Sequence, residues 1–214
     1  MKISARLRMV SSHGKRYKVK KNVSGSANTI LIAPEARFDN FSIKVTGNAN
    51  KILIGRSVLA KGEITVLGNS CLIVIGDACR LSNISLFATG AGAKISIGDK
   101  TTVEKASCAT YEGKQIEIGA DCMLGVGIVM CTSDIHSILD EKDKRINPAK
   151  DIVIGDHVWI GRFAQILKGA RIGSGSIVGT CAVVTKPFDE KSCVIAGCPA
   201  KEIQENVHWV RELV

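Results

Sequence analysis

The sequence predicts a parallel β-helix, and a six-residue repeat, many glycines and few aromatic residues together predict it. The repeat places an apolar residue at every sixth position, at Ile154, Ile160, Ile166, Ile172, Val178 and Val184. Glycine follows four of these, as Gly155, Gly161, Gly173 and Gly179. An α-helix repeats every three or four residues and a lone strand every two, so a period of six favours short strands joined by turns. With 21 glycines and 4% aromatic residues, the core must consist of small and β-branched side chains.

The predicted elements follow the chain in order. Residues 1–50 form a basic N-terminal segment that leads into irregular first coils. Residues 51–198 form the β-helix, and its earlier coils are marked by isoleucine–glycine pairs at 54–55, 75–76, 97–98 and 118–119. The next such pair, at 154–155, comes after a longer gap that contains the polar stretch 132–150, so we expect this stretch to be a loop ejected from the coils. Residues 199–214 begin with Pro199 at a turn and predict a short helix that caps the open end.

The ejected loop holds the first candidate for chemistry. Of the histidines at 13, 136, 157 and 208, only His136 lies in it, and Asp134 precedes it by two residues. A carboxylate beside an imidazole is typical of an acid–base centre, in which the carboxylate selects the useful tautomer. A solvated loop histidine and a turn-capping aspartate are the alternative interpretations.

Composition narrows the function class. A net charge of +9 favours anionic partners, but only Tyr17 lies among the basic residues near the N-terminus, so single-stranded nucleic acid is not expected. The sequence contains no signal-peptide core and no apolar run of 18 residues, which predicts a cytoplasmic protein without stable membrane insertion. The eight cysteines contain no CxxC pair and therefore predict free thiols rather than a metal site.

Three segments carry a family resemblance: S-D-I-H-S-I at 133–138, I-G-D-H-V-W-I-G at 154–161 and V-I-A-G-C-P-A-K at 194–201. Together they resemble the hexapeptide-repeat acetyltransferases, and most of all the capsular polysaccharide and sialic acid O-acetyltransferases. The resemblance covers roughly residues 50–205. It implies a left-handed helix, a homotrimer and active sites in the clefts between neighbouring subunits.

The resemblance also implies roles for single residues. His136 becomes the general base that takes a proton from a sugar hydroxyl, with Asp134 as its orienting partner and Trp159 beside the donor or acceptor. The co-substrate is acetyl-CoA, and no metal is expected. Residues expected to line the acetyl-CoA site are Trp159, Arg162, Thr180, Thr185, Lys186 and Lys201. Some relatives place an oxyanion-binding asparagine before the loop, whereas this chain has Glu104 and Lys105 there, so a backbone N–H is the alternative donor.

The predicted function is therefore an acetyl-CoA-dependent O-acetyltransferase that modifies a sugar hydroxyl of a bacterial surface polysaccharide, and the net charge of +9 favours an anionic acceptor. An amino-sugar N-acetyltransferase of the same fold is the first alternative, because it shares the donor and the histidine. A non-catalytic β-helix binding protein is the second. A zinc-dependent hydratase needs about three converging histidines, which His136 and His157 alone do not supply.

Overall fold

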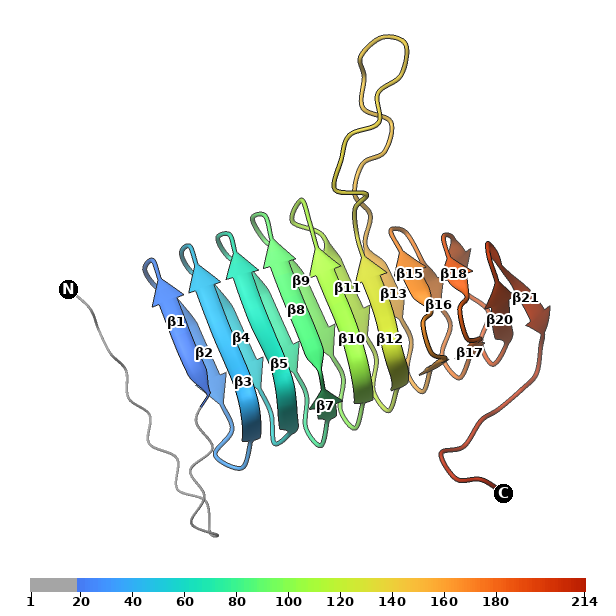
Figure 1. The fold of residues 1–214 in the computed structure, drawn as a ribbon, viewed down its shortest axis with the longest axis horizontal. Coiled ribbons are helices and arrows are strands. Elements are labelled where there is room, and N and C mark those ends of the chain that lie inside the picture. Colours follow the sequence, from blue (N-terminus) through green and yellow to red (C-terminus); the bar gives the residue numbers. More distant parts are fainter. Residues whose placement is uncertain (1–18) are drawn as a thin grey trace.

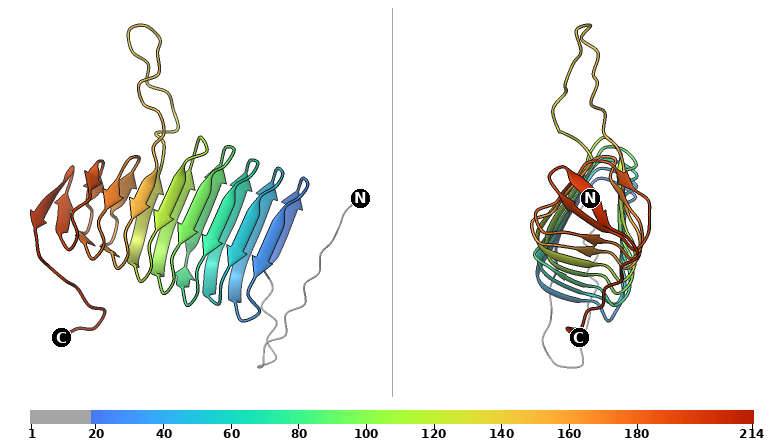
Figure 2. Two further views of the ribbon diagram at one scale, coloured as in Figure 1. Left: turned by 180° about the vertical axis from the view of Figure 1, so that it is seen from behind. Right: turned by 90° about the vertical axis from the view of Figure 1, so that its right-hand side faces the viewer.

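A computed structural model describes residues 19–214, which form a left-handed parallel β-helix that contains no α-helix in this range (Figure 1). Seen along its axis, the coils superimpose as a rounded triangle with the ejected loop projecting from one corner (Figure 2). The β-helix and the loop predicted from the sequence are thus confirmed. Because residues 19–214 contain no α-helix, they offer no helical segment that could cross a bilayer.

Two long sheets run the length of the stack, and nearly all of their strand pairs are parallel. The first sheet comprises β1 (Lys20–Ser24), β3 (Arg37–Thr46), β5 (Val58–Leu67), β7 (Arg80–Ser82), β8 (Ile84–Thr89), β10 (Thr102–Thr110), β12 (Met123–Cys131), β14 (Trp159–Ile160), β15 (Gln165–Leu167), β17 (Ile177–Val178), β18 (Val183–Val184), β20 (Val194–Gly197) and β21 (Ala200–Gln204). The second comprises β2 (Thr29–Ile32), β4 (Lys51–Ile54), β6 (Leu72–Ile75), β9 (Lys94–Ile97), β11 (Gln115–Ile118), β13 (Ile152–Ile154), β16 (Arg171–Ile172) and β19 (Pro187–Phe188).

The core is a set of stacked aliphatic columns. In one column of the second sheet each isoleucine is in register with the next, and the members are Ile52, Ile73, Ile95, Ile116 and Ile152, all 0% exposed. Burying one such side chain contributes roughly 1.5–3 kcal/mol. The coils are therefore held by repetition of the same contact.

The corners depend on residues that adopt a left-handed backbone. Asn40, Lys61 and Asn83 have φ values of 46°, 51° and 48°, and each lies where the first sheet bends. Asn40 and Lys61 interrupt the long strands β3 and β5, while Asn83 separates β7 from β8. One bent strand can thus cover two sides of the triangle.

The ends of the stack differ from the predicted boundaries. Regular coils begin at Lys20 rather than near residue 51, and the part of the basic segment before residue 19 lies outside the described residues. The predicted C-terminal helix is wrong, because Ala200–Gln204 form β21, which pairs antiparallel with β20. Tertiary pairing at the open sheet edge overrides the helical tendency of these residues. The C-terminal end of the coil stack is therefore covered by a strand instead of the predicted helix.

Buried cysteines act as small core residues. All eight cysteines are free, and burial raises the pKa of the Cys108 thiol to about 12 and that of Cys122 to about 11. These two thiols therefore stay protonated at neutral pH and fill space beside the aliphatic columns.

Candidate active site

The ejected loop leaves the coils after β12 and returns at β13 (Figure 1). His136 is exposed in it, and its backbone N–H donates to the carbonyl of Asp134 at 2.7 Å. Ile135, directly before it, has a φ of 68°, which is a strained conformation for a β-branched residue. Strain of this kind persists only where the surroundings enforce it, and it concentrates at functional sites.

Polar contacts to the coils on both sides hold the base of the loop in place. The guanidinium of Arg145 donates to both carboxylate oxygens of Glu112, at 2.9 and 2.6 Å. The ammonium of Lys168 pairs with the carboxylate of Asp134. Glu112 precedes the loop and Lys168 follows it, so the two ion pairs tie the loop to neighbouring coils.

The carboxylate of Asp134 points to the base of the loop in this structure. It accepts hydrogen bonds from Lys168 and from the side-chain amide of Asn147, and none of the hydrogen bonds within residues 19–214 joins it to the His136 ring. In this structure the Asp134 carboxylate is instead engaged through Oδ2 by one ammonium group and one amide, those of Lys168 and Asn147. Asp134 serves as a loop anchor.

Two anchoring carboxylates are held in the ionised form. The hydrogen bond from Lys168, followed by that from Asn147, lowers the pKa of Asp134 below its ordinary value. The hydrogen bond from Arg145 lowers the pKa of Glu112 in the same way. Both groups are more acidic in the folded chain than in the unfolded one, so their contribution to stability is full at neutral pH and is lost as the pH falls through the depressed pKa values.

Acidification is accordingly expected to release the loop before it affects the coils. Below about pH 3, beneath the ordinary carboxyl pKa of about 4, the amide of Ile138 should lose hydrogen-exchange protection relative to its value at pH 6. The amide of Ile95, in the aliphatic core, is the internal control and should keep its protection. NMR-detected exchange measures both, and equal protection of Ile138 at the two pH values would contradict this account of the loop base.

Trp159 lies on the coil stack rather than beside the loop. It is 39% exposed and, with Arg162, lines a cavity of about 780 Å³ on the first sheet. The other lining residues are Arg80, Ser82, Asn83, Thr102, Val103, Glu104, Met123, Leu124, Gly125 and Val126. An indole, two guanidinium groups and polar side chains thus share one hollow, which suits a ligand that is partly apolar and partly anionic.

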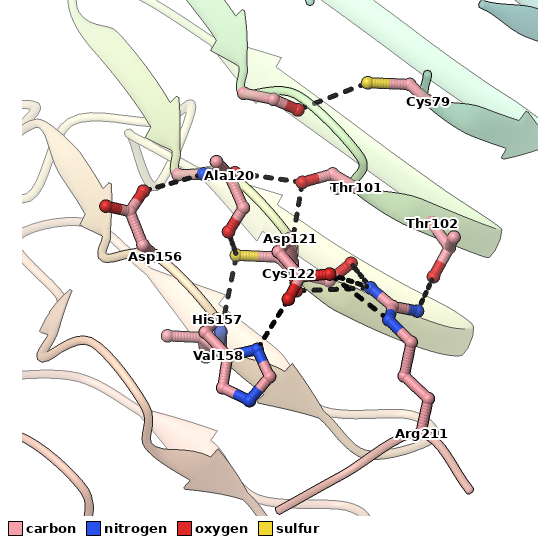
Figure 3. A network of polar contacts seen from close by, with 12 residues as sticks. Cys79, Thr101, Thr102, Ala120, Asp121, Cys122, Asp156, His157, Val158 and Arg211 are labelled. Carbon is pink, nitrogen blue, oxygen red and sulfur yellow. Dashed lines mark hydrogen bonds and ion pairs between the residues drawn. The ribbon is translucent and has the colours of Figure 1, made fainter. Parts of the chain in front are cut away.

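The C-terminal segment reaches the edge of this cavity, where Arg211 donates to the hydroxyl of Thr102, one of the lining residues, at 2.9 Å (Figure 3). Trp209 is buried, stacks on the ring of His157 at 4.1 Å between centroids and lies 6.2 Å from the Trp159 ring. His157 Nδ1 contacts the carboxylate of Asp121 at 2.8 Å, and Arg211 bonds the same carboxylate at 3.0 Å. His157 is therefore an anchor for the C-terminal segment.

The other predicted acetyl-CoA residues lie further along the stack. The N–H of Cys181, next to Thr180, donates to the carbonyl of Arg162 at 2.8 Å, so Thr180 is one coil beyond the cavity. Lys186 lies 5.4 Å from the Phe188 ring, and Lys201 is exposed on β21. Thr185 is also exposed, between β18 and β19. Trp159 and Arg162 are thus brought together, whereas the rest are spread over later coils.

Within one chain His136 and Trp159 are separated. Trp159 is in register with Met123 at the start of β12, while the loop leaves after Cys131 at its end. Fully extended, the eight steps from Met123 to Cys131 would span about 26 Å, and the bend at Gly127, whose φ is 78°, shortens this distance. The two side chains thus belong to opposite ends of β12.

Asn147, Lys168 and Trp209 are not among the residues predicted from the sequence. Asn147 lies in the polar loop among many similar residues, and Lys168 sits at an ordinary turn. Trp209 was assigned to the expected helix. The tryptophan offered a signal, because a large aromatic residue after the last repeat needs a surface on which to pack.

The sequence matches the bacterial transferase hexapeptide family over residues 151–186. It is 36% identical over 191 residues to a polysialic acid O-acetyltransferase of Neisseria meningitidis, and the match covers 88% of each chain. A polysialic acid O-acetyltransferase of Escherichia coli is 36% identical over 113 residues, which cover 52% of this chain and 36% of the relative.

Two solved structures resemble nearly the whole fold. The polysialic acid O-acetyltransferase OatWY superimposes with a TM-score of 0.85 and 32% identity, over 92% of this chain and 93% of that one. The polySia-specific acetyltransferase NeuO gives a TM-score of 0.80 and 31% identity, over 91% of this chain and 89% of that one.

Proposed function

Because the chain belongs to the hexapeptide-repeat acetyltransferases and is an O-acetyltransferase, we propose that its acceptor is an anionic polysaccharide of the polysialic acid type. The observation that carries the proposal is the likeness to the Neisseria meningitidis enzyme, which extends over 88% of both chains rather than over the repeats alone. The similarity therefore includes the segments outside the common hexapeptide pattern.

Charge supports an anionic acceptor. The chain carries a net charge of +9, and the cavity beside Trp159 includes the guanidinium groups of Arg80 and Arg162. Positive potential raises the local concentration of a polyanion and steers its approach. A neutral glycan gains nothing from this field.

The proposed reaction uses acetyl-CoA as the donor. The neutral imidazole of His136 takes the proton of a sugar hydroxyl as that oxygen attacks the thioester carbonyl carbon. The carbon–sulfur bond then breaks, the acetyl group stays on the sugar oxygen, and the CoA sulfur leaves as a thiolate that takes up the proton. Lys186 and Lys201 are proposed to attract the donor phosphates, and a backbone N–H is proposed to stabilise the oxyanion.

We propose a homotrimer with active sites between subunits. The separation of His136 and Trp159 along β12 supports it, since a loop from one subunit can meet the Trp159 surface of the next. Exposed apolar side chains in the loop support it as well: Ile135, Ile138, Leu139 and Ile146 are each more than half exposed. A patch of this kind is usual at a protein interface.

The proposed location is the cytoplasm. All eight cysteines are free, and a reducing compartment preserves free thiols. Acetyl-CoA is also available there as the donor.

The test is release of free CoA thiol from acetyl-CoA in the presence of different acceptors. The panel comprises polysialic acid, a uronic-acid polymer, a neutral glucan and a free amino sugar. We expect acceptor-dependent release with polysialic acid that weakens as ionic strength rises, because salt screens the attraction. Release with the amino sugar alone would favour the N-acetyltransferase, and release with the neutral glucan alone would contradict an anionic acceptor.

Replacement of Trp159 tests the cavity. Trp159→Ala is expected to lower kcat/KM about 10- to 100-fold, because an aromatic ring that anchors a ligand commonly contributes that much binding energy. Because the ring is only 39% exposed, its removal should also lower the unfolding temperature, so the rates are compared well below that temperature. The matched control is Val153→Ala, an exposed apolar residue of similar exposure on β13, which should leave the kinetics unchanged. Equal kinetics for both variants would remove Trp159 from the site.

A further inference from the structure

The side chain of Asn147 is buried inside the base of the ejected loop, where only 7% of the residue is exposed. All four of its hydrogen-bonding positions are occupied. Nδ2 donates to Oδ2 of Asp134 at 2.8 Å and to the carbonyl of His136 at 2.9 Å. Oδ1 accepts from the N–H of Ile138 at 2.8 Å and from Nε of Arg145 at 3.3 Å. A buried amide that is fully satisfied specifies one local geometry.

The three loop partners of this side-chain amide are residues 134, 136 and 138. The amide bonds the side-chain carboxylate of Asp134, the backbone carbonyl of His136 and the backbone N–H of Ile138, so it holds the backbone at His136 and just after it and the side chain just before it. The held segment includes the strained Ile135, whose N–H also donates to the hydroxyl of Ser133 at 3.1 Å. Without the amide, relaxation of this turn would displace the histidine.

Asn147 is itself fixed to the coil stack. Its backbone carbonyl oxygen accepts a hydrogen bond from the ammonium of Lys168 at 3.2 Å and another from the guanidinium of Arg145 at 3.2 Å. Arg145 is paired with Glu112 on the preceding coil, and Lys168 belongs to the following one. Asn147 thus links the coils to the backbone of His136: its backbone carbonyl is bonded at the loop base, and its side-chain amide bonds the His136 carbonyl. His136 itself has no regular secondary structure.

We propose that Asn147 is a positioning residue for His136. The inference rests on the proposed function, in which His136 is the general base. Catalytic groups must be held within about 0.5 Å of their productive geometry, and a displacement of about 1 Å costs on the order of 100-fold in rate. Asn147 does not touch the substrate and acts only through the loop backbone.

A double-mutant cycle tests the proposal. Asn147→Ala is expected to lower kcat by 30- to 100-fold, on the order expected for a misplaced catalytic group, with the KM for acetyl-CoA changed less than threefold. In a His136→Ala background the same substitution should have no further effect, because the group that it positions is absent. Asn69→Ala, which removes an exposed turn asparagine that bonds the N–H of Asn48, is the matched control and should retain full activity.

The outcomes separate the two proposals. A loss from Asn147→Ala that persists in full in the His136→Ala background would show that Asn147 acts independently of His136 and would refute the positioning role alone. Full activity of His136→Ala would refute the general-base assignment, and the positioning role with it. Circular dichroism and the unfolding temperature of each variant confirm that the coils remain intact.

Discussion

Replacement of His136 by alanine is expected to lower kcat by 10²- to 10⁴-fold, the range that general-base catalysis usually contributes. The imidazole is exposed, and no hydrogen bond of its ring is formed within residues 19–214, so the loss should come without a change in unfolding temperature. The measurement is the initial rate of thiol release with saturating acetyl-CoA and acceptor, together with a thermal melt.

His208→Ala is the matched control for this variant. His208 is also exposed, but it lies in the C-terminal segment away from the ejected loop. We expect it to keep the full rate. A rate for His136→Ala within a few-fold of the parent chain would mean that the proton of the acceptor hydroxyl is taken by another group.

The second large effect concerns stability and the close approach of successive coils. Gly47 has a φ of 121°, and a Cβ built there would lie 1.9 Å from the carbonyl oxygen of Gly68 on the next coil. Gly47→Ala must therefore displace the backbone of a neighbouring coil as well as strain its own. We expect a loss on the order of 3 kcal/mol or more, because backbone strain and steric overlap add.

Gly92 provides the matched control, because its φ of 75° is also left-handed but a Cβ there meets nothing within 4 Å. Gly92→Ala should cost only about 1–2 kcal/mol, the cost of a left-handed backbone in an L-residue. Thermal unfolding followed by circular dichroism compares the two variants. Equal losses would mean that coil spacing at Gly47 is more adjustable than the structure indicates.

The sequence predicted the fold because the repeat is a direct consequence of the coil geometry. The prediction of where the regular coils begin was wrong for a specific reason. Ile32 is in register with Ile54, but Ala33 follows it where Gly55 follows Ile54, so the isoleucine–glycine signature is absent. At the preceding corner, before β2 and β4, the first coils are joined by an amide ladder in which Asn50 donates to the side chain of Asn28. Side-chain ladders of this kind leave no periodic apolar signal.

The candidate site was predictable only in part. His136 is predictable because it is the one histidine in the long polar stretch 132–150 that interrupts the repeat. The loop anchors did not, because the Lys168–Asp134 pair and the packing of Trp209 on His157 join residues 34 and 52 positions apart. Such contacts follow from the coil register and the path of the C-terminal segment, and neither can be predicted from the residues on either side of a position.

The most direct test of the central claim is the NMR spectrum of polysialic acid after incubation with this chain and acetyl-CoA. We expect new acetyl groups on sugar hydroxyls that are removed by mild alkali and that do not form when His136→Ala replaces the parent chain. Alkali-stable acetyl groups on nitrogen, or a polymer left unmodified while a neutral sugar is acetylated, would contradict it.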